Sequence, residues 1–123
     1  MSDRAPELRL TLDEEGAAFA PGARVGGVAA WSAARPPRGI ELRLSWVLSG
    51  KGGRDYKIAE TIPLPTPAAA ERRRFKLTLP AAPYSFRGAL LTLSWTLELV
   101  ALPGEEKTRL ELVIAPGGRA IAL

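Results

Sequence analysis

Hydrophobic and polar residues alternate along most of this chain, and the alternation predicts a protein built from β-strands. The clearest case is residues 75–99, where two alternating runs are joined by a linker that prolines interrupt. In the second run, leucines and a tryptophan share one face, and threonine, serine and glutamate share the other. A helix would scatter these leucines around its circumference, because a period of about 3.6 residues separates positions i, i+2 and i+4.

Several other segments of the chain show the same alternation, or are bounded by turn residues, and are also predicted to be strands. Gly26 and Gly27, within one of them, predict a bulge or a close approach of neighbouring backbone. Prolines after residue 62 are suited to a sheet edge or a crossover between sheets. Including the final apolar run, the predicted strands beyond the central pair cover residues 7–12, 24–31, 40–48, 55–62 and 110–116.

Length and composition favour a single domain that folds by its core. A chain of 123 residues can bury roughly two-thirds of its unfolded surface without disulfides or a metal. We expect residues 1–6 to form an N-terminal lead and residues 7–123 to form one β-sandwich domain. The first ten residues lack the apolar segment of a signal peptide, and no apolar run approaches the roughly 20 residues that span a bilayer, so we expect a cytoplasmic location.

Two segments resemble the arrestin-like β-sandwich family. Residues 79–88, LPAAPYSFRG, are similar to that family's linker, with its "LP", second proline, "SF" and glycine before a strand that has an aromatic residue in its middle. Residues 19–28, FAPGARVGGV, are similar to its early aromatic, "PG", valine, glycine and valine pattern. With a glycine-rich hairpin between them and a closing strand at residues 110–116, the resemblance covers nearly the whole chain.

The resemblance implies an all-β fold: an immunoglobulin-like or arrestin-like β-sandwich of about seven to eight antiparallel strands. Arrestin-like domains, in eukaryotic adaptors and in bacterial sporulation-control proteins of similar fold, carry partners rather than transform substrates. The eukaryotic adaptors usually pair two sandwiches, whereas this chain has one. A homodimer could replace the missing half, and the resemblance carries over no site residue.

The charge pattern points to one candidate binding surface. The net charge is +4, and the densest basic run is residues 71–76, ERRRFK. On a strand, Arg72, Arg74 and Lys76 would project together into solvent, in a row that can contact phosphates or a partner's carboxylates. With Arg73 they are the candidate partner-binding residues. The alternative is that these charges only protect a sheet edge from aggregation.

Three tryptophans raise the question of sugar binding, because sugars stack on exposed aromatic faces. Trp46 and Trp95 share the parity of the leucines around them, so we expect both in the core. Trp31 ends its predicted strand, and it is the tryptophan whose position, in the core or on the surface, we leave open.

Three further motifs have simpler explanations than binding sites. Residues 50–54, GKGGR, lack both the helix and the Ser or Thr of a P-loop, so a hairpin turn is favoured over an anion contact. Residues 13–16, DEEG, do not have the spacing of an EF-hand loop, so a solvated turn is favoured over calcium binding. Pro36 and Pro37 lack the PxxP spacing of a ligand for an aromatic groove, so we expect a loop.

The residue types argue against an enzyme. With no His and no Cys, the chain has no imidazole base, serine triad, His-ligated metal or thiolate nucleophile. Glu41, Glu98 and Glu111 lie on polar faces of three strands and are the carboxylates from which a hydrolase could draw an acid pair. Their neighbours Arg43 and Arg109 favour cross-strand salt bridges instead. We therefore expect no catalysis, cofactor, bound metal or small-molecule substrate.

The sequence thus predicts a protein-interaction domain, an adaptor or scaffold that binds a protein partner through exposed strand edges or loops. The alternative is a module for an anionic ligand, such as nucleic acid or a phospholipid headgroup, or for a glycan, through the basic row and an exposed Trp31. We do not favour nucleic acid or a membrane surface over a protein partner.

Overall fold

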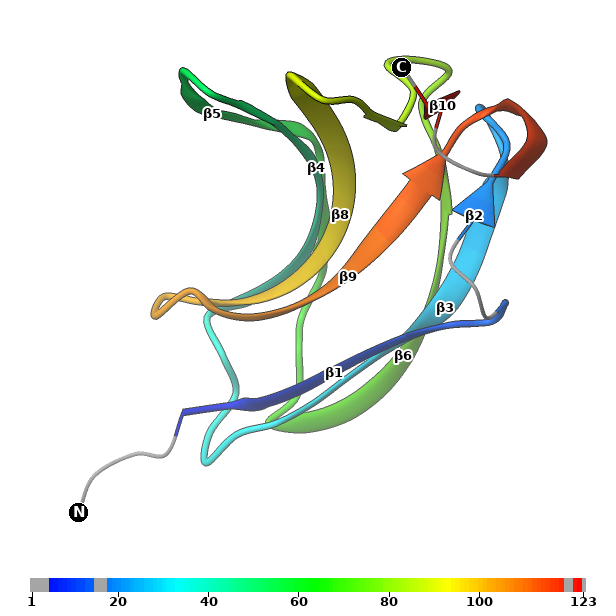
Figure 1. Ribbon diagram of the computed structural model, residues 1–123. Helices are drawn as coiled ribbons and strands as arrows, with labels where there is room; N and C mark the ends of the chain where they lie inside the picture. Colours follow the sequence, from blue (N-terminus) through cyan, green and yellow to red (C-terminus); the bar gives the residue numbers. More distant parts are fainter. Residues whose placement is uncertain (1–4, 15–17, 119–120, 123) are drawn as a thin grey trace.

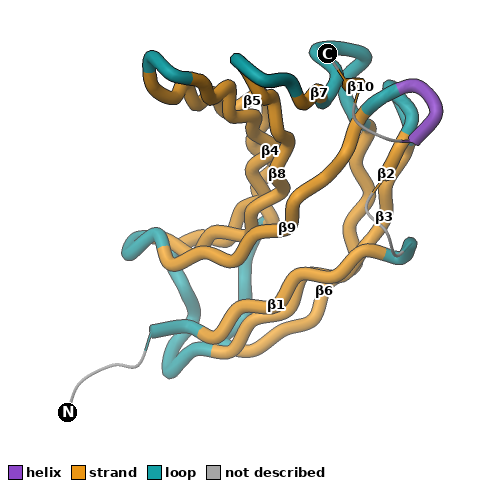
Figure 2. Tube along the Cα trace, in the orientation of Figure 1, coloured by secondary structure: helices purple, strands orange, loops and turns teal. Residues whose placement is uncertain are grey.

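The chain forms two β-sheets packed face to face. The computed structural model describes residues 5–14, 18–118 and 121–122. Figure 2 shows a trace made of strands and the loops between them, with one short helical turn, η1 (Pro116–Gly118). In chain order the strands are β1 (Glu7–Leu12), β2 (Ala18–Phe19), β3 (Arg24–Ser32), β4 (Gly39–Gly50), β5 (Gly53–Leu64), β6 (Ala70–Thr78), β7 (Phe86–Arg87), β8 (Leu91–Leu102), β9 (Glu106–Ile114) and β10 (Ile121–Ala122).

The smaller sheet contains β1, β3 and β6, all antiparallel, with β3 in the centre. β1 and β3 have the bounds that alternation predicts to within one residue. Residues of the two outer strands that pair with the same β3 residue share a face of the sheet. The row of Arg9, Ala30 and Arg72 is one example, and it lies on the face turned away from the core.

The larger sheet is built around β4 and β8, which pair along twelve residues of each strand. β5 pairs with the other side of β4, and β9 and β7 share the other side of β8. The all-β sandwich expected from the sequence is confirmed, and its long strands are antiparallel. Two short pairings, β2 with β9 and β10 with β7, are parallel, which the alternation pattern did not predict.

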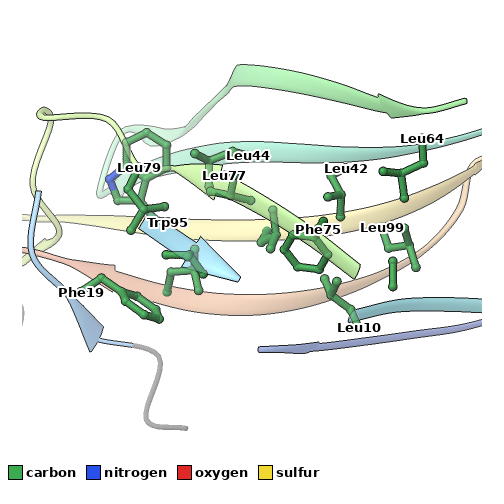
Figure 3. Packing of buried hydrophobic residues seen from close by; sticks show 14 of the residues in the cluster. Leu10, Phe19, Leu42, Leu44, Leu64, Phe75, Leu77, Leu79, Trp95 and Leu99 are labelled. Atoms are coloured by element: carbon green, nitrogen blue, oxygen red, sulfur yellow. The ribbon is translucent and has the colours of Figure 1, made fainter. Parts of the chain in front are cut away.

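Leucine and aromatic side chains fill the space between the sheets (Figure 3). Trp95, Leu97 and Leu99 of β8 are fully buried, as the alternation predicts. Trp46 is only partly buried but packs against this core, whereas Leu91, at the start of β8, is 46% exposed. Alternation therefore identified the inner face of β8 correctly, except at its first residue.

Gly27 has no side chain, and this lets β3 lie close to both of its neighbours, β1 and β6. A Cβ atom there would collide with the backbone oxygen of Thr11 on β1 and would lie 2.7 Å from Cζ of Phe75 on β6. The predicted close backbone approach is therefore present. The alternative, a bulge at Gly26 and Gly27, is wrong, because both pairings of β3 run through these residues without a shift in register.

The larger sheet is strongly curved, and its concave side faces away from the smaller sheet (Figure 1). The leucines of β4 and β8 point to the convex side, into the core, so the polar residues between them line the concave side. In the part of the chain that the structure describes, no helix is long and apolar enough to cross a membrane.

Candidate functional site

The predicted basic row lies on the outer face of the smaller sheet. Arg72, Arg74 and Lys76 are exposed and alternate with buried or half-buried residues of β6. Arg74 donates a hydrogen bond to Asp13 at 2.6 Å, so part of its charge is neutralised. Whether these residues bind a partner stays a prediction.

Arg73 lies on the opposite side of β6 from the basic row and is held by three contacts. Its Nε donates to Glu71 Oε2 at 2.7 Å, and its Nη1 donates to the carbonyl oxygen of Pro65 at 2.7 Å. Its guanidinium carbon lies 5.5 Å from the centre of the Trp31 ring. Two hydrogen bonds hold the pKa of Glu71 below its usual range. The larger effect comes from the Ala68 amide and the smaller one from Arg73. These contacts fasten the crossover from β5 to β6.

Trp31, which the sequence left open between core and surface, is buried. Only 3% of this residue is accessible, because the β5–β6 crossover covers the end of β3. The indole N–H donates a hydrogen bond to the carbonyl oxygen of Ala68 at 2.8 Å. A glycan-binding surface that depends on an exposed Trp31 is therefore ruled out.

A second surface, which sequence reasoning did not identify, is a polar pocket of about 500 Å³ on the concave side of the larger sheet. Ser45, Val47, Thr96 and Glu98 come from the two central strands. Residues of β5 and β9 stand on either side, and the pocket is completed by Arg43, Arg54, Tyr56, Ile58, Glu105, Lys107 and Arg109.

Glu98 is the buried carboxylate of this pocket, with 2% of the residue exposed. The hydroxyl of Tyr56 donates a hydrogen bond to its Oε1 at 2.9 Å. Its Oε2 lies 3.7 Å from Nη2 of Arg109 and 3.9 Å from Nζ of Lys107. A single carboxylate therefore holds two cations of β9 side by side, an arrangement that partly offsets the cost of burying its charge.

Two neighbours of Glu98 have shifted pKa values. The hydrogen bond from Arg43 to Glu41, at 2.8 Å, contributes most to a raised pKa of Arg43, and Glu105 at 3.0 Å adds to it against the effect of burial. Burial raises the pKa of the Tyr56 phenol above its usual 10.0; the adjacent Ser45 hydroxyl opposes this shift and the Glu98 carboxylate adds to it. Arg43 is therefore already neutralised by carboxylates, and Tyr56 is a neutral donor at physiological pH.

Ser45 has a buried hydroxyl oxygen that makes no hydrogen bond to any residue that the structure describes. Most buried polar groups in proteins have a partner, and leaving one without a partner costs about 1–3 kcal/mol. Since Ser45 lines the pocket, its hydroxyl is available to a bound group.

A β-bulge explains why the sequence did not reveal this pocket. Leu44 pairs with Glu60 and Ser45 pairs with Ile58, so Ala59 has no partner in β4. Before the bulge, Tyr56 and Ile58 face the concave side, and after it Ile62 faces the core. All three residues have even numbers, so a strict period of two assigns them to one face. The one signal in the sequence was the polar pair Glu98 and Arg109, which the structure does bring together.

Of the three carboxylates considered for an acid pair, two lie beside cations and the third faces a threonine. Glu41 accepts a hydrogen bond from Arg43, and Glu98 lies beside Lys107 and Arg109. Glu111 faces Thr96 across the β8–β9 pair. Across residues 5–14, 18–118 and 121–122, no cluster of three or more acidic side chains is placed to hold a metal ion.

Comparisons with known proteins identify the fold. No known family model matches the chain, and no curated protein matches it. Among solved structures, it is similar to the sporulation control protein Spo0M from Bacillus subtilis, with a TM-score of 0.66 and 18% identity over 91% of this chain and 50% of that one. The shared feature is the fold. This likeness supports the β-sandwich fold that the resemblance of residues 19–28 and 79–88 implies, and membership of the arrestin-like family stays a prediction.

Two weaker likenesses involve enzymes. The alkylpurine DNA glycosylase AlkC from Pseudomonas fluorescens has a TM-score of 0.45 and 11% identity over 89% of this chain and 30% of that one. A β-glucosidase from Listeria innocua has a TM-score of 0.47 and 13% identity over 94% of this chain and 17% of that one. The chain thus spans half the length of Spo0M and smaller parts of these two enzymes.

Proposed function

We propose that this domain is a non-catalytic, cytoplasmic interaction domain that binds an extended segment of a protein partner along β5. The observation that supports this most strongly is the open edge of the larger sheet. β5 pairs only with β4 among the described strands, and every residue from Gly53 to Thr61 is exposed. An edge strand presents unpaired backbone N–H and C=O groups to which another chain can add as a strand.

Two apolar side chains favour one part of this edge as the binding segment. Tyr56 is 53% exposed and Ile58 is 40% exposed, and both face the concave side. Beyond them, the bulge at Ala59 breaks the regular ladder and Pro63 has no amide hydrogen to donate. A partner strand would therefore pair with the segment from Arg54 to Ile58.

The likeness to Spo0M supports a non-catalytic function for this chain. That protein is described as a sporulation control protein, which is a regulatory role. The absence of His and Cys agrees with this proposal, because it removes the commonest catalytic bases and nucleophiles.

Selection of peptides from a random nine-residue library tests this proposal. The selected peptides should shift backbone amide NMR signals of β5 and its neighbours. Ile58→Lys should weaken their binding at least tenfold, because it places a charge in the apolar contact. Leu90→Lys is the matched control, since Leu90 is 72% exposed on a different loop, and it should leave the affinity unchanged. Failure to select any peptide, or shifts confined to β1 or β6, would contradict the proposal.

The outer face of the smaller sheet supports a second candidate function, the binding of an anionic polymer or membrane surface. Across this face, Arg9 and Arg72 stand on either side of the small residue Ala30. Arg74 and Lys76 continue the positive charge along β6. Such a surface would make sequence-independent contacts with phosphates.

Salt dependence tests this second candidate. A 20-base-pair DNA duplex and vesicles containing phosphatidylserine should each bind several-fold more weakly at 200 mM than at 50 mM NaCl, and the double variant Arg72→Glu, Arg74→Glu should bind neither. Binding that does not change with salt would count against it.

A further inference from the structure

The concave pocket lies next to the segment of β5 on which an added strand would pair, and it contains polar groups that have no partner among the described residues. We propose that this pocket receives a glutamate side chain of the partner segment. This inference rests on the proposed function, because it takes the added strand at β5 as given. It specifies one side chain, a glutamate, that the partner segment must contain.

The first argument is the unsatisfied hydroxyl of Ser45. Its oxygen is fully buried, makes no hydrogen bond to the described residues and lines the pocket. The nearby Tyr56 hydroxyl already donates its proton to Glu98. The Ser45 proton has no acceptor in hydrogen-bond geometry among the described residues, so a ligand group that accepts a hydrogen bond would satisfy it.

The second argument is the distribution of charge around the pocket. Arg43 is bound by Glu41 and Glu105, and Glu98 offsets one of the two charges of Lys107 and Arg109. Arg54 makes no ion pair with any residue in the described part of the chain. Since Arg43 has two carboxylate partners, four cations face three carboxylates here, and the pocket keeps one net positive charge.

The third argument is geometry. Arg54, Tyr56 and Ile58 face the pocket, so every second side chain of a strand added beside them would face it as well. Neighbouring strands lie about 4.8 Å apart, which places the added strand about 10 Å from Ser45 on β4. A glutamate side chain reaches further across β5 toward Ser45 than an aspartate side chain, which is one methylene shorter. Val47, Ile58 and the Tyr56 ring provide an apolar lining for its stem.

A carboxylate suits this pocket better than a phosphate group. The buried Glu98 places a negative charge at the base of the site, and it repels a dianion more strongly than a monoanion. The planar guanidinium of Arg54 matches the two oxygens of a carboxylate.

Four blocked nine-residue peptides of alternating threonine and valine test this inference, with Glu, Asp, Gln or phosphoserine at the central position. Fluorescence anisotropy should show that the Glu peptide binds about tenfold more tightly than the Gln peptide, with Asp between them. Arg54→Gln should abolish this preference without unfolding risk, because Arg54 is exposed. Ser45→Val should reduce it, and Arg72→Gln, on the other sheet, should leave it intact.

The outcomes separate the two proposals. Equal binding of the Glu and Gln peptides at β5 would overturn the glutamate pocket and leave the proposed function standing. Tighter binding of the phosphoserine peptide would overturn the choice of a carboxylate. If none of the four peptides, and none from the random library, shifted β5 signals, both proposals would fail together.

Discussion

Arg72 and Arg73 are neighbours in sequence but lie on opposite sides of β6, and substitution should separate their roles. Arg73→Ala removes the ion pair with Glu71, the hydrogen bond to Pro65 and the contact with the Trp31 ring. We expect it to lower the free energy of unfolding by about 1–2 kcal/mol. Arg72→Ala is the control and should change stability by less than about 0.5 kcal/mol, since Arg72 is exposed. Urea denaturation measures both, and equal losses would contradict the placement of Arg73.

Tyr56 should make the stability of the domain depend on alkaline pH. Its folded-state pKa is raised, chiefly by burial, so the folded protein retains the phenol proton at a pH where the unfolded chain has lost it. Its contribution is therefore fully present below pH 10 and is lost as pH rises through the folded-state pKa. Urea denaturation between pH 9 and 11 should show a steeper loss for the natural protein than for Tyr56→Phe. Parallel curves would show that Tyr56 has an ordinary pKa.

At the scale of single strands, Gly27 of β3 should not tolerate a side chain. Gly27→Ala places a methyl group against the backbone of Thr11 and the ring of Phe75, and we expect a loss of about 1–3 kcal/mol in the free energy of unfolding. Gly52→Ala is the matched control, because a Cβ atom there has no neighbour within 4 Å. Thermal denaturation of the two variants tests this, and an unchanged midpoint for Gly27→Ala would mean that β1 and β6 can move apart.

Most strands of this protein could be predicted from sequence because apolar residues face the core on one side and mainly polar residues occupy the other, even where that other side is itself buried, as at Glu98. β8 shows this most clearly, since its leucines and Trp95 alternate with polar residues along nearly its whole length. β5 shows the limit. It lies at an edge with most of its residues exposed, so burial imposes no pattern on it, and its bulge changes the face of every later side chain.

The candidate site was only partly predictable for the same reason. The basic residues of β6 form a visible run in the sequence. In the structure, however, Arg73 lies on the opposite face of the strand from the other basic residues of that run. The concave pocket combines residues of four strands and depends on the sheet's curvature, which neither composition nor spacing encodes. The burial of Trp31 could not be predicted because the segment that covers it, around Ala68, comes from a distant part of the chain.

At the scale of the whole molecule, the positive charge is concentrated on the smaller sheet rather than spread evenly. We therefore expect Arg72→Gln, Arg74→Gln to elute from a cation-exchange column at clearly lower salt than the natural protein. Arg38→Gln, Lys57→Gln has the same net charge, but its two sites are exposed elsewhere, and it should elute nearer to the natural protein. Identical elution of the two double variants would indicate that net charge alone determines retention.

The unpaired Ala59 should also limit the growth of fibrils from this edge of the sheet. Amyloid growth requires a flat strand whose every residue can template the next copy in register. On β5, the register with β4 shifts at Ala59, so we expect a second copy laid against this edge to match only the short segment before the bulge. That segment is long enough for the short partner strand proposed above and too short for a stack of strands to propagate.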